Sequence, residues 1–371
     1  MLHLISSSGV YGAEKMAVSL AKAQAAAGAD PMLMVFRNAH APNLEVAYYA
    51  RNQGVRTTLL PCAGRIDPRA VRTLRAEIKG LGPGAVVHAH GYKANLYAYL
   101  ASRRLPVTVV ATCHRFDTEP NNRFDARVLP RIDGVLAVSD EARDSVRTVY
   151  GVPSERCWTI PNGIEPEPFL DAVALRSPGA AGGPPAGWDD LPGPTVGMVA
   201  RLAPEKAPGD FLEAASAILE SHPGTRFIVA GDGDLRIELE LQARDLGIAD
   251  HVWFTGFVDD APGLYADLDL LVQPSLREGM PMTLLESMAS GVAVVATDVG
   301  GASQVIASGV DGVIVRPGHP QGIVDAVSGL IDDPGERNRM AQAGRARVLA
   351  EFTAERMAER YLDAYRILRR R

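Results

Sequence analysis

The sequence has few cysteines and no long apolar run, and both facts narrow the class of protein. The three cysteines, Cys62, Cys113 and Cys157, are odd in number and widely spaced, so they match no zinc, haem or disulfide pattern. We therefore expect reduced, buried thiols and a cytoplasmic protein. No stretch reaches the roughly 20 apolar residues of a membrane span, and residues 1–5 resemble a strand, so we expect no signal peptide.

Two further absences exclude whole classes of ligand. Aromatic residues make up 6% of the chain, and few of them interleave with basic residues, so we expect no nucleic-acid partner. No predicted strand is followed by G-x-G-x-x-G and then by an acidic residue about 20 positions later. This absence disfavours a dinucleotide-dependent dehydrogenase.

The composition is that of a globular protein with two domains of unequal charge. Of the 371 residues, 47% are hydrophobic and 22% are charged, which suits two domains of ordinary size. Residues 1–165 carry 20 basic and 14 acidic side chains, whereas the remainder carries 18 and 30. This asymmetry indicates two domains with different partners, although an ordinary uneven distribution of surface charges is the alternative.

Residues 268–298 predict a βαβ unit. Residues 268–272 form an apolar run of the length of a buried strand, and residues 292–297 form a second one. Between them, Pro281 stands near the start of a predicted helix and Gly291 stands just past its end. The two strands should be parallel and covered by helices on both faces.

Two carboxylates lie in this unit. Glu278 follows the first strand, and Glu286 lies on the helix, about two turns further on. Ligands bind at the carboxyl ends of such strands, and a helix start at Met282, Thr283 and Leu284 offers backbone N–H groups to a phosphate. Since carboxylates accept hydrogen bonds from sugar hydroxyls, a ligand with phosphate and hydroxyl-rich rings is predicted. A solvated pair of glutamates is the alternative.

In the first half, a strand at residues 2–6 runs through a glycine-containing loop into a helix at residues 13–27. This order allows backbone N–H groups to approach a phosphate, although the signal is weak alone.

Three histidines lie on or after predicted strands. Residues 86–90 form a strand that places His88 and His90 on the same face. They could bind a metal, but we expect no third ligand nearby, so histidines of the core or of a cleft are the simpler interpretation. His114 follows the strand at residues 107–112, where it could bind a sugar hydroxyl, transfer a proton or serve the structure.

Residues 51–79 form a basic stretch, with seven basic and two acidic side chains. We expect one helix over residues 65–79, with four arginines sharing a face: Arg65, Arg69, Arg72 and Arg75. A solvated face is the simplest interpretation. Contact with a phosphorylated acceptor or an anionic membrane surface is the alternative.

A second series of strands begins at residue 195. The strand at residues 195–200 runs into Arg201 and Lys206. Two cations at the carboxyl end of a strand can hold a diphosphate, because arginine binds bidentately and lysine acts as a point charge.

The segment EGMPMTLLESMASGVAVVATDVGG, residues 278–301, resembles the retaining GT-B glycosyltransferases of family 4, the glycosyl transferases group 1. Seven residues separate Glu278 from Glu286, as in the family's signature. Arg201 and Lys206 have the Arg-x4-Lys spacing of the family.

The resemblance implies a role for each matching side chain. Glu286 should hold ribose hydroxyls, and Glu278 should hold hydroxyls of the donor sugar. Arg201 and Lys206 should stabilise charge on the leaving diphosphate. The family also places a histidine near the donor sugar, so the implied catalytic residues are His114, Glu278, Arg201 and Lys206.

The resemblance implies further contacts on the donor and acceptor sides. Family members often carry a double glycine where this chain has Tyr11 and Gly12, so only Gly12 matches. Tyr11 and His90 are expected on the acceptor side. No Asp-x-Asp motif stands at the expected place, so we predict no metal. Besides Glu286, the expected donor-binding residues are Gly12, Gly231, Phe257, Val258, Gly279, Met280, Met282, Thr283 and Leu284.

The implied fold is α/β of the GT-B type, with two Rossmann-like domains facing across a cleft. Residues 1–168 should form the acceptor-binding domain, with the helix at about residues 355–371 packing back on it. A Gly/Pro/Ala-rich linker is expected at residues 169–194, and the nucleotide-sugar-binding domain at residues 195–354.

The expected reaction is retaining transfer of a hexosyl or related group to a hydroxyl acceptor, as in polysaccharide biosynthesis. The acceptor could be a glycan, a lipid-linked or phosphorylated compound, or a small molecule. We expect no cofactor, and a UDP-sugar in preference to a GDP- or ADP-sugar. Peripheral membrane contact of the basic domain stays open. Two alternatives remain: a nucleotide-sugar epimerase of GT-B architecture, and a non-catalytic sugar-nucleotide-binding protein.

Overall fold

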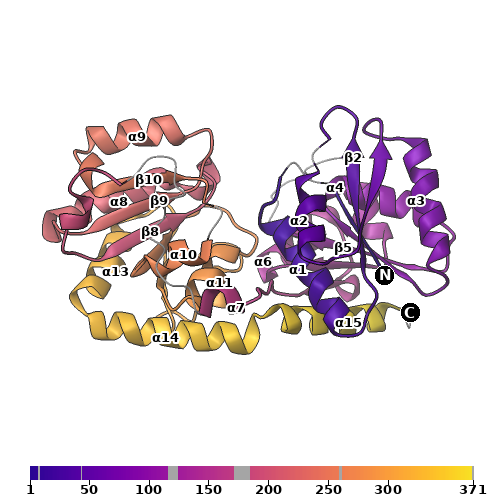
Figure 1. Cartoon of the computed structure of the whole chain (residues 1–371). Helices are drawn as coiled ribbons and strands as arrows, with labels where there is room; N and C mark the ends of the chain where they lie inside the picture. The colour runs from indigo at the N-terminus through magenta and orange to yellow at the C-terminus, as the bar shows by residue number, and fades with distance from the viewer. Residues whose placement is uncertain (7–8, 43, 116–123, 171–183, 259–260, 370–371) are drawn as a thin grey trace. The chain divides into compact units, whose positions relative to one another are not determined.

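The computed structural model contains two compact α/β units (Figure 1). The first comprises Met1–Ile164 and Phe352–Arg371, and the second comprises Glu165–Glu351. The structure describes residues 1–6, 9–42, 44–115, 124–170, 184–258 and 261–369. Half of the predicted linker, residues 171–183, lies outside these residues.

The first unit is built on a parallel sheet of seven strands, in the order β3-β2-β1-β4-β5-β6-β7. The strands are β1 (Leu2–Ile5), β2 (Met32–Asn38), β3 (Thr57–Cys62), β4 (Val86–His90), β5 (Thr108–Cys113), β6 (Gly134–Ala137) and β7 (Cys157–Thr159). The helices are α1 (Gly12–Ala26), α2 (Glu45–Asn52), α3 (Pro68–Gly80), α4 (Tyr92–Ser102), α5 (Asp125–Val128), α6 (Asp140–Tyr150) and α15 (Ala354–Arg369), with short 3-10 turns η1 (Leu129–Arg131) and η2 (Ser154–Arg156).

Helices cover both faces of this sheet, because its strands alternate side chains between two buried layers. Leu2 and Leu4 enter a core that includes residues of α3, α4 and α6. Ile5 enters the opposite core, which includes residues of α1 and α2. On that second side α15 lies beside α1 (Figure 1).

The second unit repeats this plan with six parallel strands, in the order β10-β9-β8-β11-β12-β13. The strands are β8 (Thr195–Val199), β9 (Arg226–Ala230), β10 (Val252–Gly256), β11 (Leu270–Gln273), β12 (Ala293–Thr297) and β13 (Val313–Val315). The helices are α7 (Glu167–Leu170), α8 (Pro208–Ser221), α9 (Arg236–Asp245), α10 (Ala261–Ala266), α11 (Met282–Ala289), α12 (Ala302–Val305), α13 (Pro320–Asp332) and α14 (Pro334–Glu351), with 3-10 turns η3 (Trp188–Asp190), η4 (Pro204–Lys206) and η5 (Ala249–His251).

Each sheet has a point at which the strand order reverses. In the first unit β1 lies between β2 and β4, and in the second β8 lies between β9 and β11. The loops that leave the carboxyl ends of the two strands at such a point diverge, which leaves space for a ligand. Each unit therefore has one place where its topology favours binding.

Two local expectations are wrong. The helix predicted over residues 65–79 is α3, Pro68–Gly80, because the Asp67 carboxylate caps it by accepting from the backbone N–H of Arg69 at 2.8 Å. Arg65 therefore lies in the preceding loop.

Cys113 is partly exposed, whereas Cys62 and Cys157 are buried as expected. No helix among the described residues has both the length and the apolar character to span a membrane.

Candidate functional site

Lys206 and Glu278 meet at the reversal point of the second unit. Lys206 ends the 3-10 turn after β8, and Glu278 lies in the loop between β11 and α11. Lys206 Nζ donates to Glu278 Oε1 at 2.5 Å. The Glu278 side chain is 8% exposed, so this ion pair is largely removed from water.

Two more donors fix the Glu278 carboxylate. Gln273 Nε2 donates to Oε1 at 2.7 Å, and Ser275 Oγ donates to the same oxygen at 2.8 Å. Thr283, in the first turn of α11, donates through Oγ1 to Gln273 Oε1 at 3.2 Å. Within the described residues no donor reaches Glu278 Oε2, so this oxygen can accept a hydrogen bond from a ligand.

Glu205 joins the loops that carry Arg201 and Glu278. Its backbone carbonyl accepts from the N–H of Leu276 at 2.9 Å and of Arg277 at 3.3 Å. Its carboxylate forms an ion pair with Arg201, whose side chain is 58% exposed. Because an exposed ion pair contributes little free energy, Arg201 can exchange Glu205 for an anionic ligand.

Glycines let the neighbouring loops approach closely. A Cβ on Gly300 would lie 2.6 Å from the carbonyl oxygens of both Glu278 and Gly279. Gly231 has a φ of 133°, and a Cβ there would lie 1.8 Å from the Ala200 carbonyl oxygen. Side chains at these positions would separate the loops, so the predicted site residue Gly231 has at least this structural role.

Glu286 lies in the middle of α11 and is 9% exposed. The hydroxyl of Tyr265, in α10, donates to Glu286 Oε2 at 2.9 Å. Burial raises the pKa of Tyr265, and the negative charge of Glu286 raises it further, so the phenol stays protonated and able to donate. Tyr265 thereby fixes the orientation of the carboxylate.

The other predicted donor-binding residues of this unit differ in exposure. Met280 and Leu284 are buried, so a ligand would meet their backbone rather than their side chains. Met282 and Thr283 are partly buried in the first turn of α11. After β10, Val258 is partly buried and Phe257 is 63% exposed, so its ring is accessible to a planar ligand.

The predicted histidines of the first unit belong to one hydrogen-bonded network. His114 Nε2 lies 3.3 Å from His90 Nδ1, and His90 Nε2 lies 3.1 Å from His3 Nδ1. His3 Nε2 lies 2.7 Å from Gln24 Oε1, in α1. A continuous row of hydrogen bonds thus runs from His114, at the end of β5, to α1.

A second branch of the network involves α15. Gln24 Nε2 donates to the Tyr365 hydroxyl at 3.4 Å, and this hydroxyl lies 2.7 Å from His88 Nδ1. His88 Nε2 lies 2.6 Å from Thr112 Oγ1. The α15 helix therefore contributes a polar contact to the interior of this unit.

The expectation that no third ligand lies near His88 and His90 is wrong. Parallel pairing of β1 with β4 aligns His3 with His88, and ring nitrogens of His3, His88 and His90 lie within 4.8 Å of one another. All six ring nitrogens nevertheless have a hydrogen-bond partner, so the cluster is a satisfied polar network.

Tyr11 and His90 have very different surroundings. His90 is 2% exposed, and its Nδ1 lies 3.3 Å from His114 Nε2. Tyr11 is 53% exposed and precedes Gly12, the first residue of α1. No described contact joins Tyr11 to either histidine.

Several residues of these arrangements carried no signal in the sequence. Their roles depend on strand register and on helix packing, which local patterns do not reveal. Parallel pairing, for instance, was predictable, but the partner of each strand was not. These residues are His3, Gln24, Glu205, Tyr265, Gln273, Ser275 and Tyr365.

Comparison with solved structures identifies the fold class as GT-B. The Anabaena protein HepE, solved in complex with UDP, matches with a TM-score of 0.82 at 20% identity and covers 99% of both chains. A glycosyltransferase from Rickettsia africae matches with a TM-score of 0.80 at 18% identity, over 99% of this chain and 97% of that one. The predicted GT-B fold is thus confirmed.

The chain belongs to the glycosyl transferases group 1. Residues 190–347 match the model of that name, and residues 10–168 match Glycosyltransferase Family 4. The alpha-D-kanosaminyltransferase of Streptomyces kanamyceticus is 31% identical over 320 residues, which are 80% of this chain and 79% of that protein. The D-inositol 3-phosphate glycosyltransferase of Salinispora tropica is 31% identical over 339 residues, 81% of this chain and 68% of that protein.

We expect the histidine network to be electrically neutral well below pH 6.5. Burial lowers the pKa of His3 and of His114 to about 4. Burial also lowers the pKa of His88 and of His90, and electrostatic repulsion from the neighbouring histidines lowers both pKa values further. Long-range 1H–15N NMR spectra of histidine-labelled protein at pH 5.5 should show four neutral imidazoles.

The same shifts predict a loss of stability in acid. As pH falls below 6.5 the unfolded chain binds protons before the folded chain does, so stability present above pH 6.5 declines toward pH 4. For His3 the loss is about 1.4 kcal/mol per pH unit in this window, measurable by urea unfolding. Imidazolium spectra assigned to His3, His90 or His114 at pH 5.5 would contradict the network.

Proposed function

We propose that this protein is a retaining glycosyltransferase that moves a sugar from a UDP-sugar to a hydroxyl group of an acceptor. The observation that carries the proposal is the partly buried Lys206–Glu278 pair at the reversal point of the second unit, with Arg201 on the adjoining loop. This arrangement combines cations for a diphosphate with an oriented carboxylate for sugar hydroxyls.

The choice of donor rests on the structural similarity of this chain to HepE. HepE, which has this fold, has been solved with UDP-glucose as well as with UDP. We therefore favour a UDP-sugar over a GDP- or ADP-sugar. The exposed ring of Phe257, beside Val258 at the end of β10, offers a surface for the base, and the Glu286 carboxylate, oriented by Tyr265, would bind ribose hydroxyls.

Two cations would stabilise the leaving diphosphate. When the bond between the anomeric carbon and the phosphate oxygen breaks, negative charge grows on the diphosphate. Lys206 and Arg201 would hold that charge, together with the backbone N–H groups at the start of α11. Because these groups supply the positive charge, we propose a reaction without a metal ion.

Retention follows if the acceptor attacks from the side on which the diphosphate leaves. The acceptor oxygen forms its bond to the anomeric carbon, and its proton passes to the departing phosphate oxygen. Glu278 would bind donor hydroxyls through Oε2 and need not act as a nucleophile. We assign His114 to the donor sugar as a neutral hydrogen-bonding group, and acceptor binding to the first unit.

We expect UDP to raise the melting temperature of the full-length protein more than GDP or ADP does, because a ligand stabilises the state that binds it. EDTA should leave the shift unchanged. Differential scanning fluorimetry with each nucleotide, with and without EDTA, measures both effects. A shift that EDTA removes would reject the metal-free mechanism, and the absence of any shift in folded protein would reject the donor site.

Lys206→Ala and Glu286→Ala should each lower the rate of transfer about tenfold or more, which corresponds to roughly 1.4 kcal/mol. Lys79→Ala and Glu213→Ala change exposed residues of α3 and α8 and serve as matched controls. Initial rates should be compared only among variants with intact melting transitions. A near-normal rate for either test variant would remove that residue from the site.

Retention has its own test. With a UDP-sugar of α configuration, the first product should carry an α linkage, because attack and departure occur on one face of the ring. The 1H NMR coupling constant of the anomeric proton, recorded early in the reaction, reports the linkage. A β product would show inversion and would reject the proposed attack geometry.

A further inference from the structure

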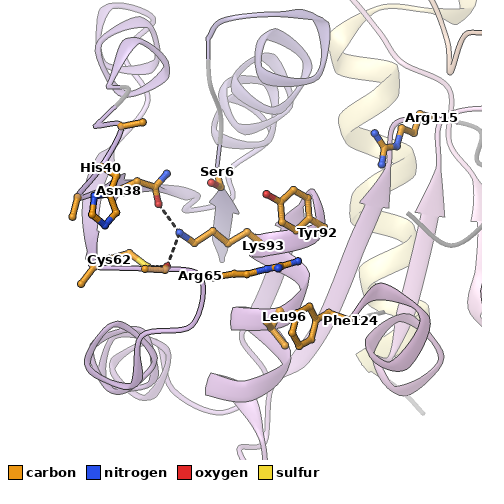
Figure 2. A pocket seen from close by; sticks show the side chains of 14 residues that line it. Ser6, Asn38, His40, Cys62, Arg65, Tyr92, Lys93, Leu96, Arg115 and Phe124 are labelled. Carbon is orange, nitrogen blue, oxygen red and sulfur yellow. Dashed lines mark hydrogen bonds between the residues drawn. The ribbon is translucent and has the colours of Figure 1, made fainter. Parts of the chain in front are cut away.

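The first unit contains a cavity of about 570 Å³ at its own reversal point (Figure 2). Its volume is in the range of small-molecule sites. The lining residues lie at or just after the carboxyl ends of five neighbouring strands, as Ser6, Asn38, Arg65, Lys93 and Arg115 show. The cavity therefore lies where this fold class places ligands.

The charged residues that line the cavity, among those that the structure describes, are all basic. Lys93, Arg65 and Arg115 contribute side chains to it, and no aspartate or glutamate is among the described lining residues. The nearby Asp67 carboxylate accepts from the backbone N–H groups of Ala63 and Arg69 and caps α3, so it is used within the protein. A cavity with this lining favours an anion.

Among the described residues, neutral groups hold Lys93 in place. Its Nζ donates to Asn38 Oδ1 at 2.5 Å and to the Gly64 carbonyl at 3.3 Å, and it lies 4.9 Å from the centre of the Phe36 ring. No described carboxylate lies within 4.0 Å of this ammonium group. Since an ammonium group has three N–H donors, one remains for a ligand oxygen.

Arg65 and Tyr92 extend the site on either side of Lys93 (Figure 2). The Arg65 guanidinium lies 5.5 Å from the centre of the Phe124 ring, a cation–π distance that restrains its planar group. Tyr92 is 56% exposed. Its ring can lie against the face of a sugar or polyol while the cations bind an anionic group.

We propose that this cavity binds a small acceptor that carries a phosphate monoester, with Lys93 and Arg65 binding the phosphate. A phosphate monoester carries a charge between about −1.5 and −2 at neutral pH, which suits two cations better than a single carboxylate does. The inference rests on the proposed function, because a hydroxyl of the same compound would receive the sugar.

Isothermal titration of the full-length protein tests the site directly. The probes are inorganic phosphate, glucose 6-phosphate and glycerol 3-phosphate, with glucose and glucuronate for comparison. At least one phosphate should bind, and glucose 6-phosphate should bind more tightly than glucose or glucuronate. Lys93→Met and Arg65→Gln should each weaken phosphate binding about tenfold or more, whereas Lys79→Met and Arg72→Gln, on the exposed surface of α3, should not.

UDP binding, measured in the same samples, separates the two proposals. Normal UDP binding with no binding of any of the three phosphates overturns the phosphate site and leaves the transferase proposal intact. Phosphate binding that persists in both Lys93→Met and Arg65→Gln, or glucuronate binding as tight as that of glucose 6-phosphate, also overturns it. Phosphate binding lost only in these two variants, with UDP bound normally throughout, supports the site.

Discussion

A partly buried ion pair between Lys206 and Glu278 joins the loops at the reversal point of the second unit. Removing two charges from water costs several kcal/mol, and the cost is offset only when further hydrogen bonds complete the arrangement. Gln273 and Ser275 supply these bonds, and Thr283 in turn fixes Gln273. The end of β11, the loop before α11 and the turn after β8 are thereby held in one geometry before any ligand arrives, which lowers the cost of binding.

Much of the α/β fold was predictable from the spacing of apolar residues and from the proline and glycine residues at helix ends. Apolar runs with Pro281 and Gly291 at the helix ends predicted the βαβ unit around Glu278, and the structure has it with shifts of one or two residues at the boundaries. What local patterns could not supply was the partner of each group. Tyr265 precedes Glu286 by 21 residues, and nothing in the intervening sequence marks their hydrogen bond. The packing of α10 against α11 brings these two side chains together, and such packing exists only in the assembled fold.

In the basic stretch at residues 51–79, local sequence patterns likewise failed to predict the surroundings of individual side chains. Spacing alone placed Arg65 with the arginines of α3, but the cap by Asp67 starts the helix later and leaves Arg65 in a loop beside the cavity. Arg75, which remains on α3, donates to the backbone carbonyls of Ala101 and Arg103 and so joins α3 to the end of α4. Arg65 and Arg75 thus have different surroundings, because the cap and the neighbouring helix act on each separately.

The histidine network has a direction, and the Gln24 amide sets it. With Gln24 Oε1 toward His3, the His3 Nε2–H donates to it, His90 Nε2–H donates to His3, and His114 Nε2–H donates to His90. Every imidazole in this row then carries its proton on Nε2, and His114 presents a bare Nδ1. Rotation of the one amide by half a turn would exchange its donor and acceptor and reverse every bond in the row. A buried glutamine on α1 thus selects, three hydrogen bonds away, which nitrogen of His114 carries the proton and which carries the lone pair.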